Sequence, residues 1–221
     1  MEERYLRNLG ALTERECALL RTKKVFVAGC GGLGGHSIDM LLRLGVGELT
    51  VADGDVFEPS NLNRQLLSDV NVIGHSKAET AAIRARAVNP QVRFTAVAEY
   101  VSPVNVAALL RGCDAVIDAL DNIPSRKLLS EACARAAIPY VYGAIQGWVA
   151  QAAVILPGCG LMDTLYPQGA ELGSKSSLAC TPALCAALQT ALCVKLLCGR
   201  QVEAGRLYLF DLLNMELETV F

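Results

Sequence analysis

The sequence predicts an α/β protein: a Rossmann-like, doubly wound, mostly parallel sheet with an N-terminal helical segment and C-terminal antiparallel strands. Short apolar strands alternate with helical segments between residues 24 and 143, and repeated strand–helix–strand units form an open parallel sheet with helices on both faces. The first strand also leads directly into a glycine-rich turn, residues 29–35, that opens a helix. A turn in this position is typical of nucleotide-binding units.

Local signals define the elements in order. Residues 1–20 are expected to be helical, with Thr13 and Glu16 in a capping-box pattern. Strands are expected, as buried apolar runs, at residues 24–28, 48–52, 92–97, 115–119 and 140–143. The helices between them are expected at residues 33–44, 76–88, 104–110 and 124–137.

The alternation ends after the fifth strand. Residues 149–156 look like a strand without a preceding crossover helix, and residues 157–180 form a long polar loop of the kind that is usually functional or disordered. Thr181 and Pro182 predict a helix start, a cap followed by proline. This helix runs to Leu197 and is apolar nearly all round, so it should be buried. Two final strands, joined as a hairpin at residues 212–214, are expected at residues 207–210 and 216–220.

The length of 221 residues predicts one domain. Its expected parts are an N-terminal helical arm, a nucleotide-binding core, and a C-terminal part with the crossover loop, the buried helix and the terminal strands, at residues 1–22, 23–145 and 146–221. Apolar residues make up 52% of the chain and charged residues 19%, a composition that argues against disorder. The net charge of −2 gives no indication of a nucleic-acid or anionic-membrane partner.

The sequence also predicts a soluble, cytoplasmic protein with no membrane partner. The N-terminus lacks the apolar core of a signal peptide. The longest apolar stretch, residues 182–194, contains Gln189 and Thr190 and is shorter than the roughly 20 residues that span a bilayer.

Nine cysteines are present, an odd number that cannot pair fully within the chain, and no CxxC motif occurs. Most of them lie in apolar runs and are expected to be small core residues. With His36 and His75 as the only histidines, no zinc site is predicted.

The glycine-rich turn and the acid after the second strand predict a nucleotide site. Gly29, Gly31 and Gly34 let the backbone approach a phosphate at a helix N-terminus, although a plain tight turn is an alternative. Asp53 stands where an acid accepts hydrogen bonds from ribose hydroxyls. Because NAD and ATP both carry such a ribose, Asp53 does not distinguish them. Asp55 could equally serve a turn or a cap.

Charged residues further along favour a triphosphate. Arg64 lies between two amides, and Lys77 starts a helix, where it could otherwise be a solvated surface residue. A triphosphate with its roughly four negative charges needs such cations, whereas a dinucleotide at a helix terminus does not. Asp121 follows the fourth strand, at the edge where ligands bind, and could hold Mg²⁺. Asp121 or Asn122 could instead cap the next helix.

Five motifs in order resemble the HesA/MoeB/ThiF adenylyltransferase family, relatives of the ubiquitin-activating enzymes, and the short ThiF-type proteins most of all. Together they span most of residues 4–126. They are Arg4-Tyr5-x-Arg7-Asn8, Gly29-Cys30-Gly31-Gly32-Leu33-Gly34, Asp53-x-Asp55 through Ser60-Asn61-Leu62-Asn63-Arg64-Gln65, Gly74-His75-Ser76-Lys77, and Asp121-Asn122-x-x-x-Arg126. The late helix, with the sequence TPALCAALQTALCVKLL, also looks like the C-terminal helix of the family.

The resemblance implies that ATP and Mg²⁺ are the cofactors. The C-terminal carboxylate of a small ubiquitin-like sulfur carrier, typically ending in Gly-Gly, would attack the α-phosphate, form an acyl-adenylate and release pyrophosphate. Asp121 matches the Mg²⁺-linked acid, and Arg7 matches an arginine that reaches the partner subunit's site, which implies a homodimer. The implied nucleotide-binding residues are Gly29, Gly31, Gly32, Gly34, Asp53, Asp55, Asn61, Arg64, Gln65, Lys77, Asp121, Asn122 and Arg126.

The sequence departs from the family at its cysteines. The paired CxxC zinc ligands of many members are missing, which supports the expectation of no zinc. Cys180, at the end of the long loop, could take part in sulfur transfer or be an ordinary cysteine beside a buried helix. Two other function classes remain open: an NAD(P)-dependent oxidoreductase, which leaves Arg7, Arg64 and Lys77 unexplained, and a non-catalytic binding partner.

Overall fold

The structure is a computed structural model that describes residues 2–171, 173 and 176–220. Its strands are β1 (Lys24–Ala28), β2 (Glu48–Ala52), β3 (Arg93–Val97), β4 (Ala115–Asp118), β5 (Tyr140–Gln146), β6 (Val149–Ile155), β7 (Leu207–Asp211) and β8 (Glu216–Val220). Its helices are η1 (Glu3–Asn8), α1 (Glu14–Leu20), α2 (Gly32–Leu44), η2 (Pro59–Asn61), α3 (Lys77–Val88), α4 (Val106–Leu109), α5 (Ile123–Arg135), α6 (Leu161–Leu165) and α7 (Cys180–Leu197).

The strands form one sheet in the order β3-β2-β1-β4-β5-β6-β7-β8. Strands β1 to β5 pair in parallel, with Val25 of β1 opposite Leu49 of β2 and Ala115 of β4. From β5 onward the pairing becomes antiparallel, through β6, β7 and β8. The predicted fold class is therefore confirmed, including its C-terminal antiparallel strands.

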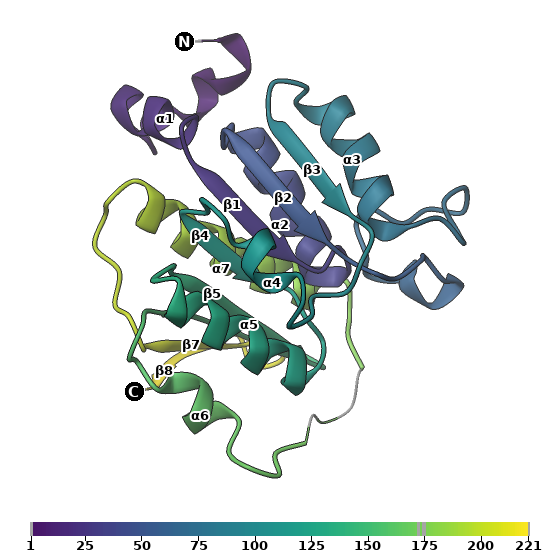
Figure 1. Ribbon diagram of the computed structural model, residues 1–221, viewed down its shortest axis with the longest axis vertical. Helices are drawn as coiled ribbons and strands as arrows, with labels where there is room; N and C mark the ends of the chain where they lie inside the picture. Colours follow the sequence, from purple (N-terminus) through teal and green to yellow (C-terminus); the bar gives the residue numbers. More distant parts are fainter. Residues whose placement is uncertain (1, 172, 174–175, 221) are drawn as a thin grey trace.

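Helices cover both faces of the sheet (Figure 1). Apolar side chains of α2, α3 and α7 pack with the strands in one core cluster, and those of α4, α5 and α6 pack with them in the other. In β1, β2 and β4 every side chain from the second residue of the strand onward is buried. This matches strands covered on both sides.

Helix α7 packs beside α2 on one face of the sheet. Among the residues that the structure describes, it is the one helix long and apolar enough to cross a membrane, and half of it is buried within the fold. It contacts α2 and the strands β4, β5 and β6. These contacts give α7 the packing of a core helix.

Three local predictions differ from the structure. Helix α7 begins at Cys180 with Ala179 as its N-cap, so the prediction of Thr181 as the cap was wrong: its hydroxyl donates to the Gly147 carbonyl at 2.8 Å. Strand β5 continues to Gln146 because it pairs with β6 along its whole length. The loop predicted at 157–180 contains α6, while its residues 172, 174 and 175 lie outside the described residues.

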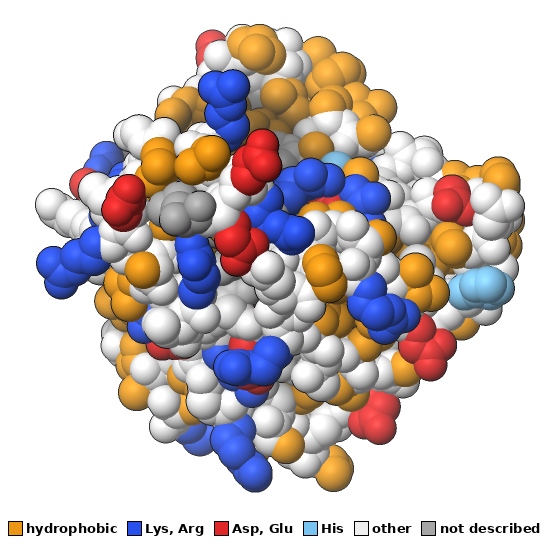
Figure 2. Space-filling view, turned by 90° about the horizontal axis from the view of Figure 1, so that it is seen from above, with side chains coloured by type: hydrophobic (Ala, Val, Ile, Leu, Met, Phe, Trp, Pro, Cys, Tyr) orange, Lys and Arg blue, Asp and Glu red, His pale blue; other side chains and the backbone are white. Residues whose placement is uncertain are grey.

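The predicted capping box of the N-terminal arm is confirmed. The Thr13 hydroxyl accepts from the Glu16 amide at 3.2 Å, and the Glu16 carboxylate accepts from the Thr13 amide at 2.8 Å. The arm lies at the end of the sheet where the parallel strands begin (Figure 1). Figure 2 looks onto this end and shows basic side chains interspersed with acidic ones. Ion pairs such as Lys24–Glu48 at 2.9 Å belong to this end of the sheet.

Candidate functional site

A cavity of about 600 Å³ opens at the carboxyl ends of the parallel strands. It contains most of the predicted site residues, although these are spread over nearly a hundred positions of the chain. The predicted residues that line it are Gly29, Gly31, Gly32, Asp53, Asp55, Arg64, Gln65, Lys77, Asp121, Asn122 and Arg126. Gly34, Asn61, Arg7 and Cys180 are not among its lining residues.

The glycine-rich turn lies directly on the end of β4. Gly29 has a φ of +100°, and a Cβ there would stand 2.6 Å from the Ala119 carbonyl oxygen. A Cβ at Gly34 would overlap the carbonyl oxygen of Gly29. Glycine is thus required at both positions for the backbone to make this turn, and the turn delivers the N-terminus of α2 to the cavity.

Asp53 holds the glycine-rich turn in place from the end of β2. Its Oδ2 accepts from the Cys30 amide at 2.7 Å, and its Oδ1 accepts from the Asp55 amide at 2.8 Å. Burial raises the pKa of the Asp53 carboxyl, and these two amide donors partly oppose the increase. The Asp53 carboxylate also lines the cavity.

Asp55 connects two further side chains of the cavity. The Lys77 Nζ lies 3.0 Å from Asp55 Oδ2 although Lys77 is buried, and the Tyr100 hydroxyl donates to Asp55 Oδ1. Burial alone would raise the pKa of Asp55, but Tyr100 and Lys77 together hold it below its usual value. Tyr100 was missed by the sequence analysis, because an aromatic residue after a strand has no distinctive pattern.

The segment after β2 places Arg64 and Gln65 at the cavity and turns Asn61 away from it. Asn61 is buried, and its Oδ1 accepts from the Glu58 amide at 3.0 Å. Arg64 Nη1 donates to the Ser60 carbonyl at 3.0 Å and to Asn63 Oδ1 at 2.8 Å. The guanidinium is thereby held at the rim by contacts with its own turn.

Asp121 and Asn122 follow β4 at the same edge. The Asn122 Oδ1 accepts from the Ser125 amide at 2.9 Å, so Asn122 caps α5. Asp121 is exposed and lines the cavity. The negative charge of Asp121 partly opposes the lowering of the Asp55 pKa by Tyr100 and Lys77. Carboxylates that face one cavity from two strand ends fit a site for a divalent cation bound together with phosphates.

Arg126 lies beneath the cavity. Its guanidinium forms an ion pair with Asp118 at 2.7 Å, and only 5% of the side chain is exposed. It also donates to the Gly143 carbonyl at 2.7 Å and to the Leu120 carbonyl. Three of its N–H groups are therefore used within the protein.

Arg7 lies at the other end of the sheet. It belongs to η1, where it is exposed. In the same helix the Tyr5 hydroxyl accepts from Asn89 at 2.7 Å, and the Tyr5 ring packs where a Cβ of Gly45 would be. Both neighbours precede strands, so η1 is anchored at the amino ends of the strands and Arg7 is remote from the cavity of its own chain.

The cavity continues along β5 and β6 beneath the crossover loop. Tyr142, Gln151 and Tyr166 line this part, and the two tyrosine hydroxyls lie 2.8 Å apart. The loop is fastened where the Ser176 carbonyl accepts from the Gly147 amide at 2.9 Å, and the Ser177 carbonyl accepts from Asn63 at 3.1 Å. Cys180 follows directly and is exposed.

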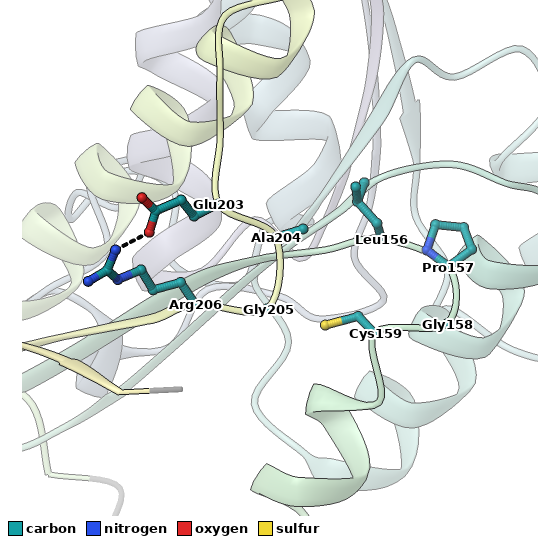
Figure 3. A pocket seen from close by; sticks show the side chains of 8 residues that line it. All are labelled: Leu156, Pro157, Gly158, Cys159, Glu203, Ala204, Gly205 and Arg206. Carbon is teal, nitrogen blue, oxygen red and sulfur yellow. Dashed lines mark hydrogen bonds and ion pairs between the residues drawn. The ribbon is translucent and has the colours of Figure 1, made fainter.

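A second cavity, of about 550 Å³, lies between the loop after β6 and the segment before β7. Figure 3 shows the Cys159 sulfur directed at Gly205, beside the ion pair of Glu203 with Arg206. This cavity shares no lining residue with the first cavity. Among the described residues no group of three or more His, Cys, Asp or Glu side chains could hold a metal ion.

Comparison with known proteins identifies the family. The ThiF family model matches residues 5–220. The chain belongs to the ThiF family. This confirms the family resemblance that the motifs predicted.

Three curated relatives show which proteins this ThiF-family chain is similar to. A SAMP-activating enzyme E1 of Haloferax volcanii is 38% identical over 91% of this chain and 77% of its own length. A sulfur carrier protein adenylyltransferase of Thermus thermophilus is 34% identical over 88% and 77%. A probable adenylyltransferase/sulfurtransferase MoeZ of Mycobacterium tuberculosis is 32% identical over 91% of this chain, which spans about half (54%) of that relative.

Solved structures share the fold of the ThiF-family chain. Crystal structures of E. coli MccB with MccA-N7isoAsn and with ATP align over 100% of this chain and 71% of MccB, with TM-scores of 0.84 and 0.82. Their sequence identities are 21% and 20%. The likeness therefore concerns the fold.

Proposed function

We propose that this protein is an ATP-dependent adenylyltransferase of the ThiF/MoeB type that activates the C-terminal carboxylate of a ubiquitin-like sulfur carrier. The observation that supports this best is one cavity that unites the glycine-rich turn with Asp53, Lys77 and Asp121. A site for a nucleoside triphosphate needs an acceptor for the sugar and a turn that binds phosphates. It also needs cations and an acid that holds a divalent metal. The named adenylyltransferases among its relatives support the same class.

The proposed reaction needs positioning and charge compensation and no protein nucleophile. Asp53 would accept from the ribose, and the turn at Gly31 and Gly32 would contact phosphates through its amides. The carrier carboxylate oxygen attacks the α-phosphorus, and the bond to the bridging oxygen breaks, so pyrophosphate leaves with the electron pair. Arg64 and Lys77 would neutralise the charge that develops on it. Mg²⁺, when bound with ATP, would be held by Asp121 and would offset further phosphate charge.

The carrier tail would enter along β5 and β6. This part of the cavity passes beneath the crossover loop, next to Ala144 and Gly173. These two small residues leave room for an extended backbone. A tail that ends in Gly-Gly fits such a narrow space because its last two residues have no side chains. The tail would thus meet the α-phosphate near Asp121.

The proposal extends to the assembly and to sulfur. Arg7 is remote from its own cavity, so a role in catalysis requires a homodimer in which it reaches the partner's site, within a cytoplasmic protein without nucleic-acid or membrane partners. Cys180 is exposed at the N-terminus of α7 and would take part in sulfur transfer after adenylation. Cys180→Ser should then retain pyrophosphate exchange and lose only the sulfur-transfer product; loss of exchange would contradict this role.

The test is carrier-dependent exchange of labelled pyrophosphate into ATP. Wild-type protein should catalyse exchange that requires Mg²⁺ and a carrier with a free C-terminal carboxylate. Asp121→Ala should lower the rate about 100-fold or more, because the acid is exposed at the cavity and its loss removes transition-state charge compensation. Asp163→Ala, an exposed acid of α6 outside this cavity, should leave the rate unchanged. Equal rates in the two variants would contradict the mechanism.

A further inference from the structure

Beneath the cavity lies a buried polar cluster that the proposed chemistry does not use. Asp118 and Gln189 have no exposed surface, and Arg126 is 4% exposed. Burying a charge pair and an amide is costly unless each group is hydrogen-bonded. The cluster therefore has a specific arrangement, and its first member stands three residues before Asp121.

The hydrogen bonds of Arg126 converge on the end of β4. Its Nη1 donates to Asp118 Oδ2 and to the Gly143 carbonyl, each at 2.7 Å, and its Nη2 donates to the Leu120 carbonyl. The Leu120 amide in turn donates to Asp118 Oδ1 at 2.9 Å. The ion pair thus fixes both the backbone N–H and the backbone carbonyl of Leu120.

Gln189 fixes the same segment from the opposite face of the sheet. Its Nε2 donates to the Asp118 carbonyl at 2.7 Å and to the Val141 carbonyl at 3.1 Å. The side chain stands where a Cβ at Gly143 would be. Helix α5 contributes Arg126 and helix α7 contributes Gln189, so the two faces of the sheet together hold the backbone at the end of β4.

We propose that Arg126 and Gln189 are positioning residues for adenylation: they fix the backbone of residues 118–120 and thereby set the place of Asp121, while Arg126 makes no contact with the nucleotide. This rests on the proposed function of the cavity. It differs from the expectation that Arg126 binds the nucleotide directly. The geometry supports it because the guanidinium is nearly enclosed and both of its Nη atoms donate to backbone carbonyls or to Asp118.

Electrostatics agrees with a permanent ion pair. Burial raises the pKa of the Asp118 carboxyl, and the Arg126 guanidinium opposes the increase. Burial alone would lower the pKa of Arg126, but the Asp118 carboxylate raises it. The Arg126 guanidinium therefore keeps its charge and acts on Asp118 as a hydrogen-bond donor, not as a proton donor.

The experiment measures kcat, the KM for ATP and the Mg²⁺ concentration for half-maximal exchange in Arg126→Lys and Gln189→Met. Lysine keeps the charge but lacks the planar fork, and methionine keeps the volume but lacks the amide donors. We expect kcat to fall about 10- to 100-fold, since displacements of about 1 Å have such effects. The KM for ATP should stay within about 3-fold, because the ribose and phosphate groups are held elsewhere, while the Mg²⁺ requirement should rise.

Matched controls separate positioning from general damage. Arg135→Lys changes an exposed arginine of the same helix α5, and Thr190→Val changes the residue next to Gln189 in α7, whose hydroxyl has no hydrogen-bond partner among the described residues. Both should behave as wild type. Thermal unfolding of every variant shows whether it is folded, and Gln189→Met tests the inference if Arg126→Lys does not fold.

The outcomes are distinct. A raised KM for ATP with unchanged kcat would mean that Arg126 or Gln189 contacts the nucleotide, and unchanged kinetics in both folded variants would mean that the cluster only stabilises the fold; either result overturns the inference. Failure of the proposed function would appear separately, as wild-type protein without exchange or as an Asp121→Ala variant with full activity.

Discussion

Asp55 acts as a shared acceptor for Lys77 and Tyr100 at the mouth of the cavity. The sequence left its role open between ribose binding and a turn. In the structure its two oxygens are used by the Lys77 ammonium and the Tyr100 hydroxyl. Lys77 is buried, and its ion pair with Asp55 holds the ammonium in place at the cavity.

Asp55→Asn should therefore destabilise the protein. An amide keeps the shape and one acceptor oxygen but leaves the buried Lys77 ammonium without a negative partner. We expect the free energy of unfolding to fall by about 1–3 kcal/mol, measured by urea denaturation at pH 7. Tyr100→Phe removes only an exposed hydrogen bond and should cost about 0.5–1.5 kcal/mol. A loss for Asp55→Asn no larger than that for Tyr100→Phe would contradict this role.

Sequence motifs named many of the residues that meet at the cavity but not how they are connected. Asp53, Lys77 and Asp121 could be named because each follows a strand or starts a helix at the ligand-binding edge. Tyr100 could not, since an aromatic residue after a strand has no distinctive pattern. The partner of Arg126 was also hidden, because Asp118 looks like the end of an apolar strand and its charge becomes meaningful only when α5 packs above it.

At the scale of elements, the glycine-rich turn requires glycine at position 34 but tolerates a side chain at position 32. Gly34→Ala would drive its Cβ into the Gly29 carbonyl oxygen and should cost about 3 kcal/mol. A Cβ at Gly32 would lie 3.4 Å from Pro182, an ordinary contact, so Gly32→Ala should stay within about 0.5 kcal/mol of wild type. Thermal unfolding of the two variants tests the difference, and equal melting temperatures would refute it.

Helix α1 is tied to the end of α7 by Glu16 and Arg200. The guanidinium contacts both carboxylate oxygens, with Nη2 at 2.8 Å from Oε2. Hydrogen bonding from Arg200, and then from the Thr13 amide, lowers the pKa of Glu16 to about 2. Because the folded-state pKa lies below the unfolded value, this contribution to stability is present at neutral pH and is lost as the pH falls from about 4.5 towards 2.

Glu16→Gln should consequently lower the urea midpoint at pH 7, while the gap to wild type narrows as the pH falls below about 4.5. Glutamine retains the acceptor for the capping box, so the difference reports the loss of the ion pair with Arg200. Glu14→Gln, in the same first turn of α1, serves as the control for helix effects. A gap that stays constant down to the lowest pH at which the protein folds would contradict the assignment.

Element predictions succeeded where the pattern was local. Parallel strands were recognisable as apolar runs, and the Thr13–Glu16 box as a helix start. Helix α6 was missed because its five residues lie in a loop rich in glycine and proline. The start of α7 was misplaced by two residues because Thr181 and Pro182 match a cap motif, whereas the Thr181 hydroxyl donates to the Gly147 carbonyl at the tip of the β5–β6 hairpin.

For the whole molecule, the position of Arg7 leads to a prediction about assembly. Arg7→Ala and Asp121→Ala should each lose exchange activity, and mixing the two proteins should restore about a quarter of the wild-type rate. Random reassociation makes half of the dimers mixed, and each mixed dimer contains one intact site. Size-exclusion chromatography checks that dimers form. Mixtures without recovery, despite subunit exchange, would rule out a shared site.

The position of α7 in the chain order has a consequence for synthesis on the ribosome. Leu192 and Cys193 of α7 share a core cluster with Val25 and Ile117 of the parallel strands, yet α7 follows β5 by more than thirty residues. At about 5–20 residues per second, several seconds pass between the emergence of β5 and that of the complete α7. During that interval the part of this face that α7 covers, over β4 and β5, lacks its helix. The growing polypeptide is therefore most vulnerable to aggregation, and most in need of a chaperone, just before its last helix appears.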